Sequence, residues 1–398
     1  MNSKTNILFL GVICSEKLIS EIINKKIGNP HTAAQKYNRL LMEGIVKNPD
    51  IFTLKVVSQP EYNLKQLIKS FKETQNGVNY LYLTYCKYKS IKLTINSIKL
   101  LYLVAKWKFQ ARKTDHYLMF DVLHLYSALM AFFYSKIMRI KKITIITDLP
   151  DYIPNTISQK SVITKLRNYL ENFIIKNSDV HIALTQQTLI HINTPLKKSI
   201  IIEGLVNNSV HVPNLTNENI KNKIIHYSGG LYENYGVKAL IEAFMQIPDN
   251  SIEFHLFGNG DLVDYVNACQ HSDHRIKYFG YQSNQVVIED QLNSFILVNP
   301  RFSCDDFTKY SFPSKTVEYM ASGVPLLTNR LEGIPSEYFN YAFIFEEETI
   351  DGYKKTLEKI IKYPKNEMIE FGKRAQNFVL DNKNNKLQAL RLHKILIN

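Results

Sequence analysis

Short runs of apolar residues alternate with longer stretches of helical periodicity along almost the whole chain. A run of this kind is typical of a strand buried in a parallel sheet, and the intervening helices cover that sheet. The pattern therefore predicts an α/β fold. The apolar runs lie at 7–13, 52–57, 80–84, 143–147, 180–184, 200–202, 224–227, 252–257, 276–279, 295–298, 325–328 and 342–345.

A polar segment at 213–223 divides these runs into two series. With 398 residues the chain is longer than one hydrophobic core usually supports, so each series is predicted to form its own domain. The predicted boundaries give an N-terminal domain at 1–207, a second domain at 208–380 and a helical segment at 381–398.

The chain is basic, with 49 lysines and arginines against 36 acidic residues and a formal net charge of +13. Such a charge indicates an anionic partner, and composition alone leaves nucleotide diphosphates, anionic lipid and nucleic acid open. No recognisable nucleic-acid-binding module accompanies the charge, so we do not expect nucleic acid as the partner.

The four cysteines are scattered singly and form no CxxC pair. This spacing predicts neither a disulfide framework nor a zinc site, and it favours a reducing, cytosolic location. The first apolar run, at 7–13, is too short to span a membrane and lacks a small-residue cleavage site. It is therefore predicted to be a buried strand.

Residues 312–327 combine a polar loop, a short helix, a glycine stop and an apolar strand. Pro313 and Ser314 suit the first turn of a helix, whose free backbone N–H groups attract anions such as phosphate. Lys315 adds a positive charge to that turn, and Glu318 lies one turn after Ser314 on the same face. The arrangement predicts a site for a phosphate and a ribose, with a plain amphipathic helix as the alternative interpretation.

This segment resembles the donor-nucleotide segment of retaining glycosyltransferases with the GT-B fold, most nearly glycosyltransferase family 4 (glycosyl transferases group 1) of the bacterial capsule and O-antigen type. The resemblance implies two Rossmann-like domains facing a cleft, with the donor bound by the second and the final helix returning to the first. In the family pattern two glutamates lie eight positions apart. Glu318 matches the second, which bonds the nucleotide ribose, and Tyr310 stands where the first would contact the donor sugar.

The start of the second domain shows the same resemblance with two departures. A strand is followed by Gly229, Gly230 and then a helix, an order that lets the backbone approach a phosphate closely. In family 4 an arginine follows the first glycine and a lysine precedes a later one. Gly230 and Tyr235 occupy those places here, so both usual phosphate cations are absent from this loop.

Three other basic residues are candidates for the missing charge. Lys315 is expected to bind the donor and to stabilise its leaving diphosphate. Arg301 follows an apolar strand and is expected to point into the cleft. Lys309 is the third candidate, with an ordinary surface lysine as the alternative.

Two more turns complete the predicted donor site. Gly258 and Gly260 end a strand in a pattern similar to the glycine pair that family members place near the donor base and phosphates. Tyr281 lies where members commonly bind the nucleobase through backbone groups. The predicted donor-binding residues are Gly229, Gly230, Gly258, Gly260, Tyr281, Arg301, Phe312, Pro313, Ser314, Lys315 and Glu318.

Catalytic candidates on the acceptor side follow strands of the first domain. Asp148 and Asp151 follow the strand at 143–146, so their carboxylates are expected at the carboxyl end of the sheet. Asp148 is predicted to contact or deprotonate the acceptor and Asp151 to bind it, with helix capping as the alternative for Asp148. His124 lies two residues before Tyr126, which stands at the place of a catalytic-site histidine in the family; a structural histidine is the alternative.

The first loop after a strand usually reaches the cleft in this fold. Gly28, Asn29 and Thr32 lie in that loop and are expected to touch the acceptor or the donor phosphate, with helix initiation as the alternative. Asp305 and Asp306 are adjacent, which is the wrong spacing for the Asp-x-Asp of metal-dependent glycosyltransferases. No metal site is therefore predicted.

Two stretches of the first domain mix apolar, aromatic and basic residues. The stretch 91–113 contains Trp107, which is the single tryptophan, among six lysines and arginines, and the stretch 118–142 is apolar and ends in four basic residues. Basic amphipathic helices of this kind can lie on an anionic membrane leaflet. Core helices with solvated lysines are the alternative.

The patterns and the resemblance together predict a retaining glycosyltransferase, hexosyltransferase-like, that needs no metal and no cofactor beyond its nucleotide-sugar co-substrate. Its expected partners are a nucleotide-diphosphate sugar, a glycan or lipid-linked saccharide acceptor and an anionic membrane surface. We expect it in the cytoplasm, peripheral on the inner face of the plasma membrane, in cell-surface polysaccharide synthesis. A nucleotide-sugar epimerase of the same fold and a non-catalytic sugar-nucleotide-binding protein are the alternatives.

Overall fold

The structure is a computed structural model, and it describes residues 4–28, 32–60, 62–63, 67–110, 115–147, 149, 162–194, 197–207 and 223–397. The chain forms two compact units. The first unit contains Met1–Leu205 together with Asn384–Asn398, and the second contains Val206–Lys383. Each unit is described by itself.

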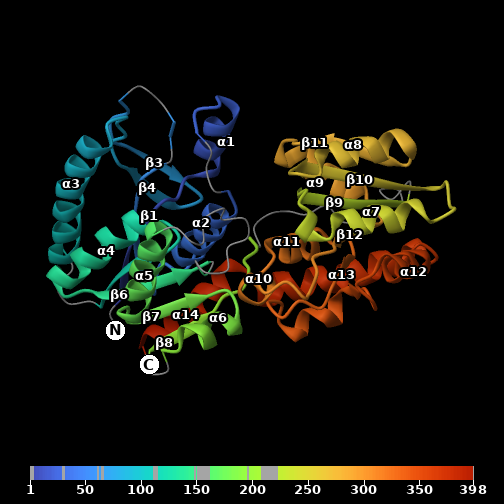
Figure 1. Ribbon diagram of the computed structural model, residues 1–398. Coiled ribbons are helices and arrows are strands. Elements are labelled where there is room, and N and C mark those ends of the chain that lie inside the picture. The colour runs from blue at the N-terminus through green and yellow to red at the C-terminus, as the bar shows by residue number, and fades with distance from the viewer. Residues whose placement is uncertain are drawn as a thin grey trace. The chain divides into compact units, whose positions relative to one another are not determined.

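The described part of the first unit contains an eight-stranded sheet in the order β3-β4-β2-β1-β5-β6-β7-β8 (Figure 1). All neighbouring strands are parallel except β3 and β4, which form an antiparallel hairpin at the edge. The strands are β1 (Thr5–Gly11), β2 (Phe52–Ser58), β3 (Phe71–Gln75), β4 (Val78–Tyr82), β5 (His116–Asp121), β6 (Lys141–Ile146), β7 (Val180–Ala183) and β8 (Lys198–Ile201).

Helices α3, α4 and α5 share one apolar core with strands β1 and β5, whose Leu8 and Phe120 are buried in it. The predicted stretch 118–142 is therefore not one amphipathic helix, since it contains the end of β5, the whole of α4 and the start of β6. The helices of this unit are α1 (Glu16–Asn24), α2 (Thr32–Val46), α3 (Lys89–Gln110), α4 (Leu125–Met138), α5 (Val162–Lys176), α6 (Gln186–Ile192) and α14 (Asn385–Ile397).

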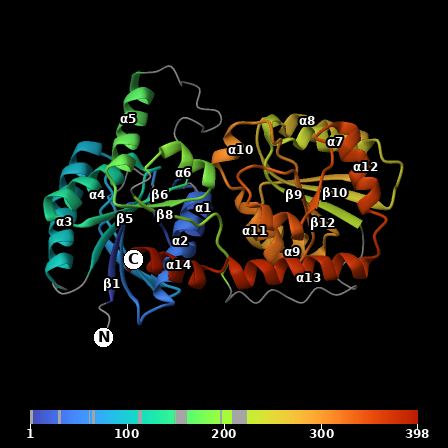
Figure 2. The ribbon, with the colours of Figure 1, turned by 90° about the horizontal axis from the view of Figure 1, so that it is seen from below.

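Helix α14 packs against α2, although more than 330 residues of chain separate Asn48 and Lys386 (Figure 2). The Asn385 side chain donates to the Leu40 carbonyl at 3.1 Å, and the Asn48 side chain donates to the Lys386 carbonyl at 3.1 Å. A Cβ added at Gly44 would lie 2.1 Å from the Asn385 carbonyl oxygen. Glycine at this position therefore permits the close approach of the two helices.

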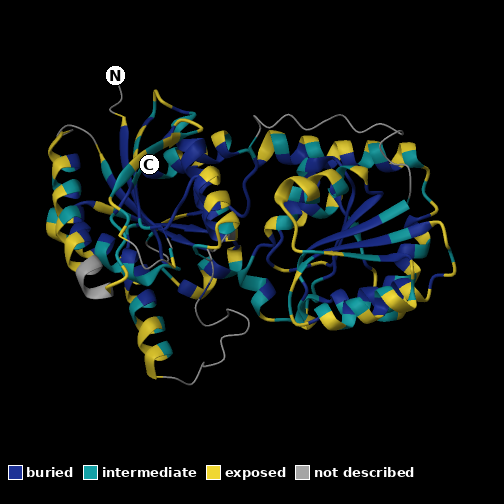
Figure 3. Cartoon of the chain, turned by 90° about the horizontal axis from the view of Figure 1, so that it is seen from above, coloured by how far each residue is buried: buried dark blue, intermediate teal, exposed yellow. Residues whose placement is uncertain are grey.

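The described part of the second unit contains a six-stranded parallel sheet in the order β11-β10-β9-β12-β13-β14. Its central strands are largely buried, as Figure 3 shows by colour, and they are mostly apolar because helices cover both faces. The strands are β9 (Lys223–Gly230), β10 (Ile252–Asn259), β11 (Ile276–Gly280), β12 (Ile296–Asn299), β13 (Leu326–Thr328) and β14 (Phe343–Ile344).

A core of Phe244, Phe254, Leu256 and Phe295 lies against this sheet. The helices are η2 (Glu233–Tyr235), α7 (Val237–Met245), α8 (Val263–Ser272), α9 (Asn284–Asn293), α10 (Phe307–Tyr310), α11 (Ser314–Ser322), η3 (Ser336–Tyr341), α12 (Ile350–Ile360) and α13 (Lys365–Asn382). The predicted α/β class with two parallel-sheet domains is confirmed.

Candidate functional site

The polar turns of the second unit gather at one edge of its sheet. Strands β9 and β10 are parallel and in register, so Gly229 lies opposite Gly258. Strand β12 pairs with the other side of β9 and ends at Asn299, two residues before Arg301. Because parallel strands end at the same edge, the predicted donor residues of these three turns lie on one side of the unit.

The glycines of two of these turns are required by close packing. Gly258 has a φ of +134°, and a Cβ there would lie 1.8 Å from the Gly229 carbonyl oxygen. A Cβ at Gly260 would lie 2.2 Å from the Leu231 carbonyl oxygen. The Gly-x-Gly pattern therefore first serves to bring the ends of β9 and β10 together.

Substitution of Gly258 by alanine is expected to destabilise the protein by more than about 2 kcal/mol, because strain and backbone overlap add. Gly280→Ala is the matched control, since Gly280 also has a positive φ, +68°, but a Cβ there meets no atom within 4 Å. The control should cost only about 1 kcal/mol. Denaturant unfolding measures the free energy of unfolding of both variants. Equal losses would contradict this expectation, because they would mean that the backbone moves to relieve the contact between the new Cβ and the Gly229 carbonyl oxygen.

Arg301 lies against the aromatic side chains of neighbouring loops. Its guanidinium carbon is 4.4 Å from the centre of the Tyr235 ring and 5.9 Å from that of Phe307. A Cβ at Gly236 would lie 2.1 Å from the Pro300 carbonyl oxygen, so the two loops are in direct contact. The cation of Arg301 therefore sits beside Tyr235, one of the two places where the sequence lacks an expected cation.

Helix α11 begins after Pro313, where no side chain caps it. Lys315 Nζ lies 3.2 Å from Glu318 Oε2, and these side chains are about one third and one fifth exposed. Burial by itself lowers the pKa of Lys315, but the negative charge of Glu318 outweighs it, and the pKa is raised above its usual value. Lys315 is therefore held in its charged form beside Glu318.

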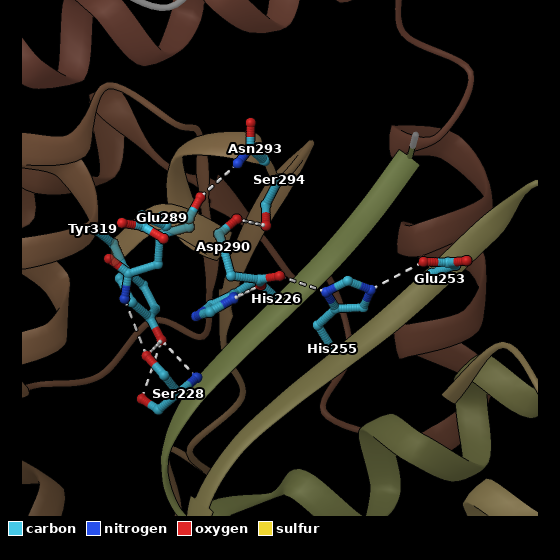
Figure 4. Close-up of polar contacts among 10 residues, drawn as sticks. His226, Ser228, Glu253, His255, Glu289, Asp290, Asn293, Ser294 and Tyr319 are labelled. Atoms are coloured by element: carbon cyan, nitrogen blue, oxygen red, sulfur yellow. Dashed lines mark hydrogen bonds and ion pairs between the residues drawn. The ribbon is translucent and has the colours of Figure 1, made fainter. Parts of the chain in front are cut away.

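Tyr319 ties α11 to the end of β9 (Figure 4). Its hydroxyl accepts from the Ser228 backbone N–H at 3.0 Å and lies 3.2 Å from the Ser228 carbonyl oxygen. Gln291 on α9 donates to the Ser228 hydroxyl at 3.1 Å. These contacts attach the helix that carries Lys315 and Glu318 to Ser228, the residue directly before Gly229. Nothing in the sequence predicts them.

A network of hydrogen-bonded polar side chains connects β9, β10 and α9. Asp290 on α9 accepts from His226 Nδ1 at 2.5 Å and from His255 Nδ1 at 2.7 Å, and His255 Nε2 lies 3.0 Å from Glu253 Oε2 (Figure 4). These four residues come from two strands and a helix, and His226 is fully buried. They tie α9 to β9 and β10.

The pKa values of the residues in this network follow from their burial and their hydrogen-bond partners. Burial by itself raises the pKa of Asp290, but hydrogen bonds from His226 and His255 lower it to about 2. Burial lowers the pKa of His226 below its ordinary value. Burial also acts downward on His255, yet Asp290 and Glu253 raise its pKa overall. Asp290 is therefore ionised at neutral pH and shared by two different histidines.

The remaining donor candidates differ in their surroundings. Phe312 is 5% exposed and packs against Tyr338 with ring centroids 5.6 Å apart, so its side chain belongs to the core. Tyr281 is 68% exposed. Lys309 lies 3.2 Å from Asp306 and 3.9 Å from Glu332, which makes it part of a surface ion-pair cluster.

Three acceptor-side candidates, Asp148, Asp151 and Asn29, lie outside the described residues. Thr32 opens α2, and Gly28 lies beyond the end of α1. His124 directly precedes α4, and its carbonyl accepts from Ser127 Oγ at 2.9 Å.

Asp121, at the end of β5, was not proposed from the sequence. Its carboxylate is 1% exposed and accepts from Asn38 Nδ2 and from the Leu123 backbone N–H, both at 2.9 Å. The Thr147 hydroxyl, directly after β6, lies 3.4 Å from the same carboxylate. Asp121 therefore fixes the loop before His124 and the residue before Asp148. Its position directly after an apolar run was the available signal.

Residues 213–378 match the family model described as glycosyl transferases group 1. No curated protein matches the chain. Among solved structures, the chain is similar to sucrose-phosphate synthase from Thermosynechococcus elongatus, with a TM-score of 0.68, 13% identity, and 99% of this chain and 98% of that chain covered.

Anabaena Alr3699/HepE in complex with UDP gives a TM-score of 0.63 at 15% identity, covering 99% of both chains. The lipopolysaccharide outer core galactosyltransferase WaaB gives 0.60 at 15% identity, covering 97% of this chain and 99% of that chain. These likenesses show that the fold is GT-B. The family match lies entirely in the second unit, which carries the polar edge described above, and it supports a glycosyltransferase.

Proposed function

We propose that this glycosyltransferase moves a sugar, with retention of configuration and without a metal ion, from a nucleotide-diphosphate donor to a glycan acceptor. The observation that carries the proposal is the polar edge of the second unit, where α11 presents Lys315 and Glu318 beside the ends of β9 and β12. The family match covers this edge, and the structurally similar Alr3699/HepE is described in complex with UDP and with UDP-glucose.

The uncapped start of α11 and the side chain of Lys315 would receive the diphosphate, because both offer positive potential to an anion. Glu318 would accept hydrogen bonds from the ribose hydroxyls. Arg301 stands beside Tyr235 and supplies a second cation on the neighbouring loop. In this assignment Lys315 contacts both Glu318 and the donor diphosphate. Its ion pair with Glu318 holds the Glu318 carboxylate in position for the ribose before the donor binds.

The reaction breaks the bond between the anomeric carbon and the diphosphate oxygen. It forms a bond from the same carbon to the acceptor oxygen on the same face, and the acceptor proton passes to a base. The negative charge that develops on the leaving diphosphate is stabilised by Lys315 and Arg301. We assign the base to Asp148, with Asp151 and His124 as acceptor-side residues of the same unit.

Thermal unfolding in the presence of nucleotide-diphosphate sugars tests the donor part. A donor at 100 times its dissociation constant should add about 2.7 kcal/mol of stability, whereas free sugars should add nothing. A panel that varies the base and the sugar separately identifies both. The proposal fails if no nucleoside diphosphate and no nucleotide sugar stabilises the protein.

We further propose that the acceptor is a lipid-linked saccharide in capsule or O-antigen assembly, at the inner face of the plasma membrane. The lipopolysaccharide galactosyltransferase among the similar structures supports this acceptor class. Incubation of labelled donor with membrane extracts should place label in a lipid-extractable saccharide. Label that remains in an epimerised nucleotide sugar, with no acceptor added, would instead indicate an epimerase.

A further inference from the structure

Helices α3, α4 and α5 expose large apolar side chains on the surface that faces away from their shared core. Helix α4 contacts both of the others, so the three form one continuous layer. On α3 the side chains of Ile98 and Tyr102 are 68% and 60% exposed, and on α4 Ile137 is 65% exposed. We call this layer's outer surface the outer helical face.

Helix α5 has the clearest apolar line. Val162, Leu166, Tyr169 and Phe173 follow one another at intervals of three or four residues, and they are 80%, 57%, 67% and 39% exposed. Residues at this spacing share one side of a helix. Glu171, Ile174 and Ile175 lie on the opposite side and are buried. The helix is thus apolar on two sides. One side packs against the first unit, whereas the exposed line contacts it at its end, where Phe173 meets Phe132 of α4 with ring centroids 5.6 Å apart. Figure 2 shows α5 projecting from that unit.

The charges of the outer helical face have one sign. Helices α3, α4 and α5 contain five, one and three lysines or arginines, and their single acidic residue is Glu171. Glu171 is 1% exposed and is paired with Arg167 at 2.7 Å. The outer helical face therefore exposes no carboxylate on these helices, although the whole chain has 36 acidic residues.

We propose that the outer helical face binds the surface of an anionic lipid bilayer, with the apolar line of α5 among the lipid headgroups. Exposed apolar side chains flanked by lysines are the chemistry that an anionic bilayer surface receives. A second copy of the same face would bring like charges together, which disfavours self-association. Among the described helices none is long and apolar enough to cross a membrane, so the contact is at the surface.

The inference deepens the proposed lipid-linked acceptor by naming the surface that meets the lipid, but its test needs no activity. Tyr169→Trp provides a reporter on α5, because the single native tryptophan, Trp107, is 5% exposed and emits from the core. With vesicles of phosphatidylglycerol and phosphatidylcholine the emission should shift to the blue and be quenched by brominated acyl chains. Tyr281→Trp, on an equally exposed residue of the second unit, is the matched control and should show neither effect.

Sedimentation with vesicles measures the strength of binding. Lys165→Glu with Lys176→Glu should lower the partition coefficient at least about 30-fold, since each lysine near an anionic surface contributes about fivefold. Val162→Ser with Leu166→Ser should also release the protein, since both side chains are exposed. Val286→Ser with Ile288→Ser, two exposed apolar residues on α9, should leave sedimentation unchanged.

Three results would overturn the proposal: no sedimentation with anionic vesicles, sedimentation that 1 M salt leaves unchanged, or equal loss in the α9 control. If the outer helical face instead binds a second copy of the protein, sedimentation velocity without vesicles should show a dimer, and the α5 variants should be monomeric. Circular dichroism and donor-induced thermal stabilisation of the α5 variants should match those of the parent protein. Failure of the vesicle test therefore stays separate from failure of the donor assignment.

Discussion

Lys315→Met is expected to lower turnover by about 100- to 1,000-fold, the usual loss when one preorganised donor of transition-state charge stabilisation is removed. The physical reason is that the leaving diphosphate gains negative charge as the bond to the sugar breaks, and Lys315 is held charged by Glu318. Methionine keeps the length and apolar contacts of the side chain but removes the charge. Steady-state kinetics with saturating acceptor measure the loss.

The matched control is Lys309→Met, because Lys309 is also on the second unit but pairs only with exposed acidic residues at the surface. It should retain activity within a factor of about two. Binding of the nucleoside diphosphate product should weaken in the Lys315 variant and stay constant in the Lys309 variant. Unchanged nucleotide affinity and turnover at Lys315 would remove it from the donor site.

Asp290→Ala is expected to lower the free energy of unfolding by about 3–5 kcal/mol at neutral pH, since removal of one partner leaves buried polar groups without compensation. The Nδ1 atoms of both His226 and His255 lose their acceptor, so α9 keeps its tie to β9 through Gln291 but loses these two hydrogen bonds to β9 and β10. Glu289→Ala is the neighbouring control on the same helix, where the carboxylate is exposed. It should change stability by less than about 0.5 kcal/mol. A loss at Asp290 no larger than the control's would contradict the structural role.

The pH dependence of this loss follows from the pKa shifts. The pKa of Asp290 is lowered to about 2, so its stabilising effect is complete above its unfolded pKa of about 3.9 and disappears as the pH falls through about 2. The pKa of His255 is raised, so its charge-dependent contribution is complete below about 6.5 and is lost as the pH rises through the folded value. His226 has a lowered pKa and acts in the opposite direction, losing its contribution as the pH falls below about 6.5.

The difference between the parent protein and Asp290→Ala should therefore be largest in the mildly acidic range and smaller at pH 2 and at pH 9. Urea unfolding at closely spaced pH values measures it. A difference independent of pH would mean that the contact of Asp290 with the histidines is not electrostatic. His255→Gln should remove the decline on the alkaline side while leaving the acid side in place.

Most central strands of both sheets could be predicted because their side chains are buried on both faces, which leaves apolar runs in the sequence. The central strand β5 was not predicted, because its apolar residues run on into those of α4 and the whole stretch 118–142 resembled one helix. Strand β3 was not predicted, since its sequence Phe71–Gln75 is mostly polar and it pairs only at the sheet edge. The second apolar line of α5 also went unnoticed. A helix with two apolar sides loses the simple amphipathic pattern, and only the structure shows which side is covered.

Part of the candidate site could also be predicted from local sequence patterns. Lys315 and Glu318 are neighbours on one helix turn, so local spacing predicts their proximity. The contacts of Tyr319 with Ser228, 91 residues away, and of Asp290 with His226, 64 residues away, depend on tertiary packing. A functional motif can also contain core residues. Phe312 was predicted to bind the donor from its place in the motif, but its side chain packs into the core.

The return of α14 to the first unit has a consequence for the order of folding during synthesis. The helix that donates from Asn385 to the Leu40 carbonyl of α2 leaves the ribosome only after the whole second unit has been made. At 5–20 residues per second, the roughly 180 intervening residues take on the order of 10–35 s. During that time the surface of α2 around Gly44 has no partner helix from this chain, so the nascent first unit is incomplete while the second is already able to fold.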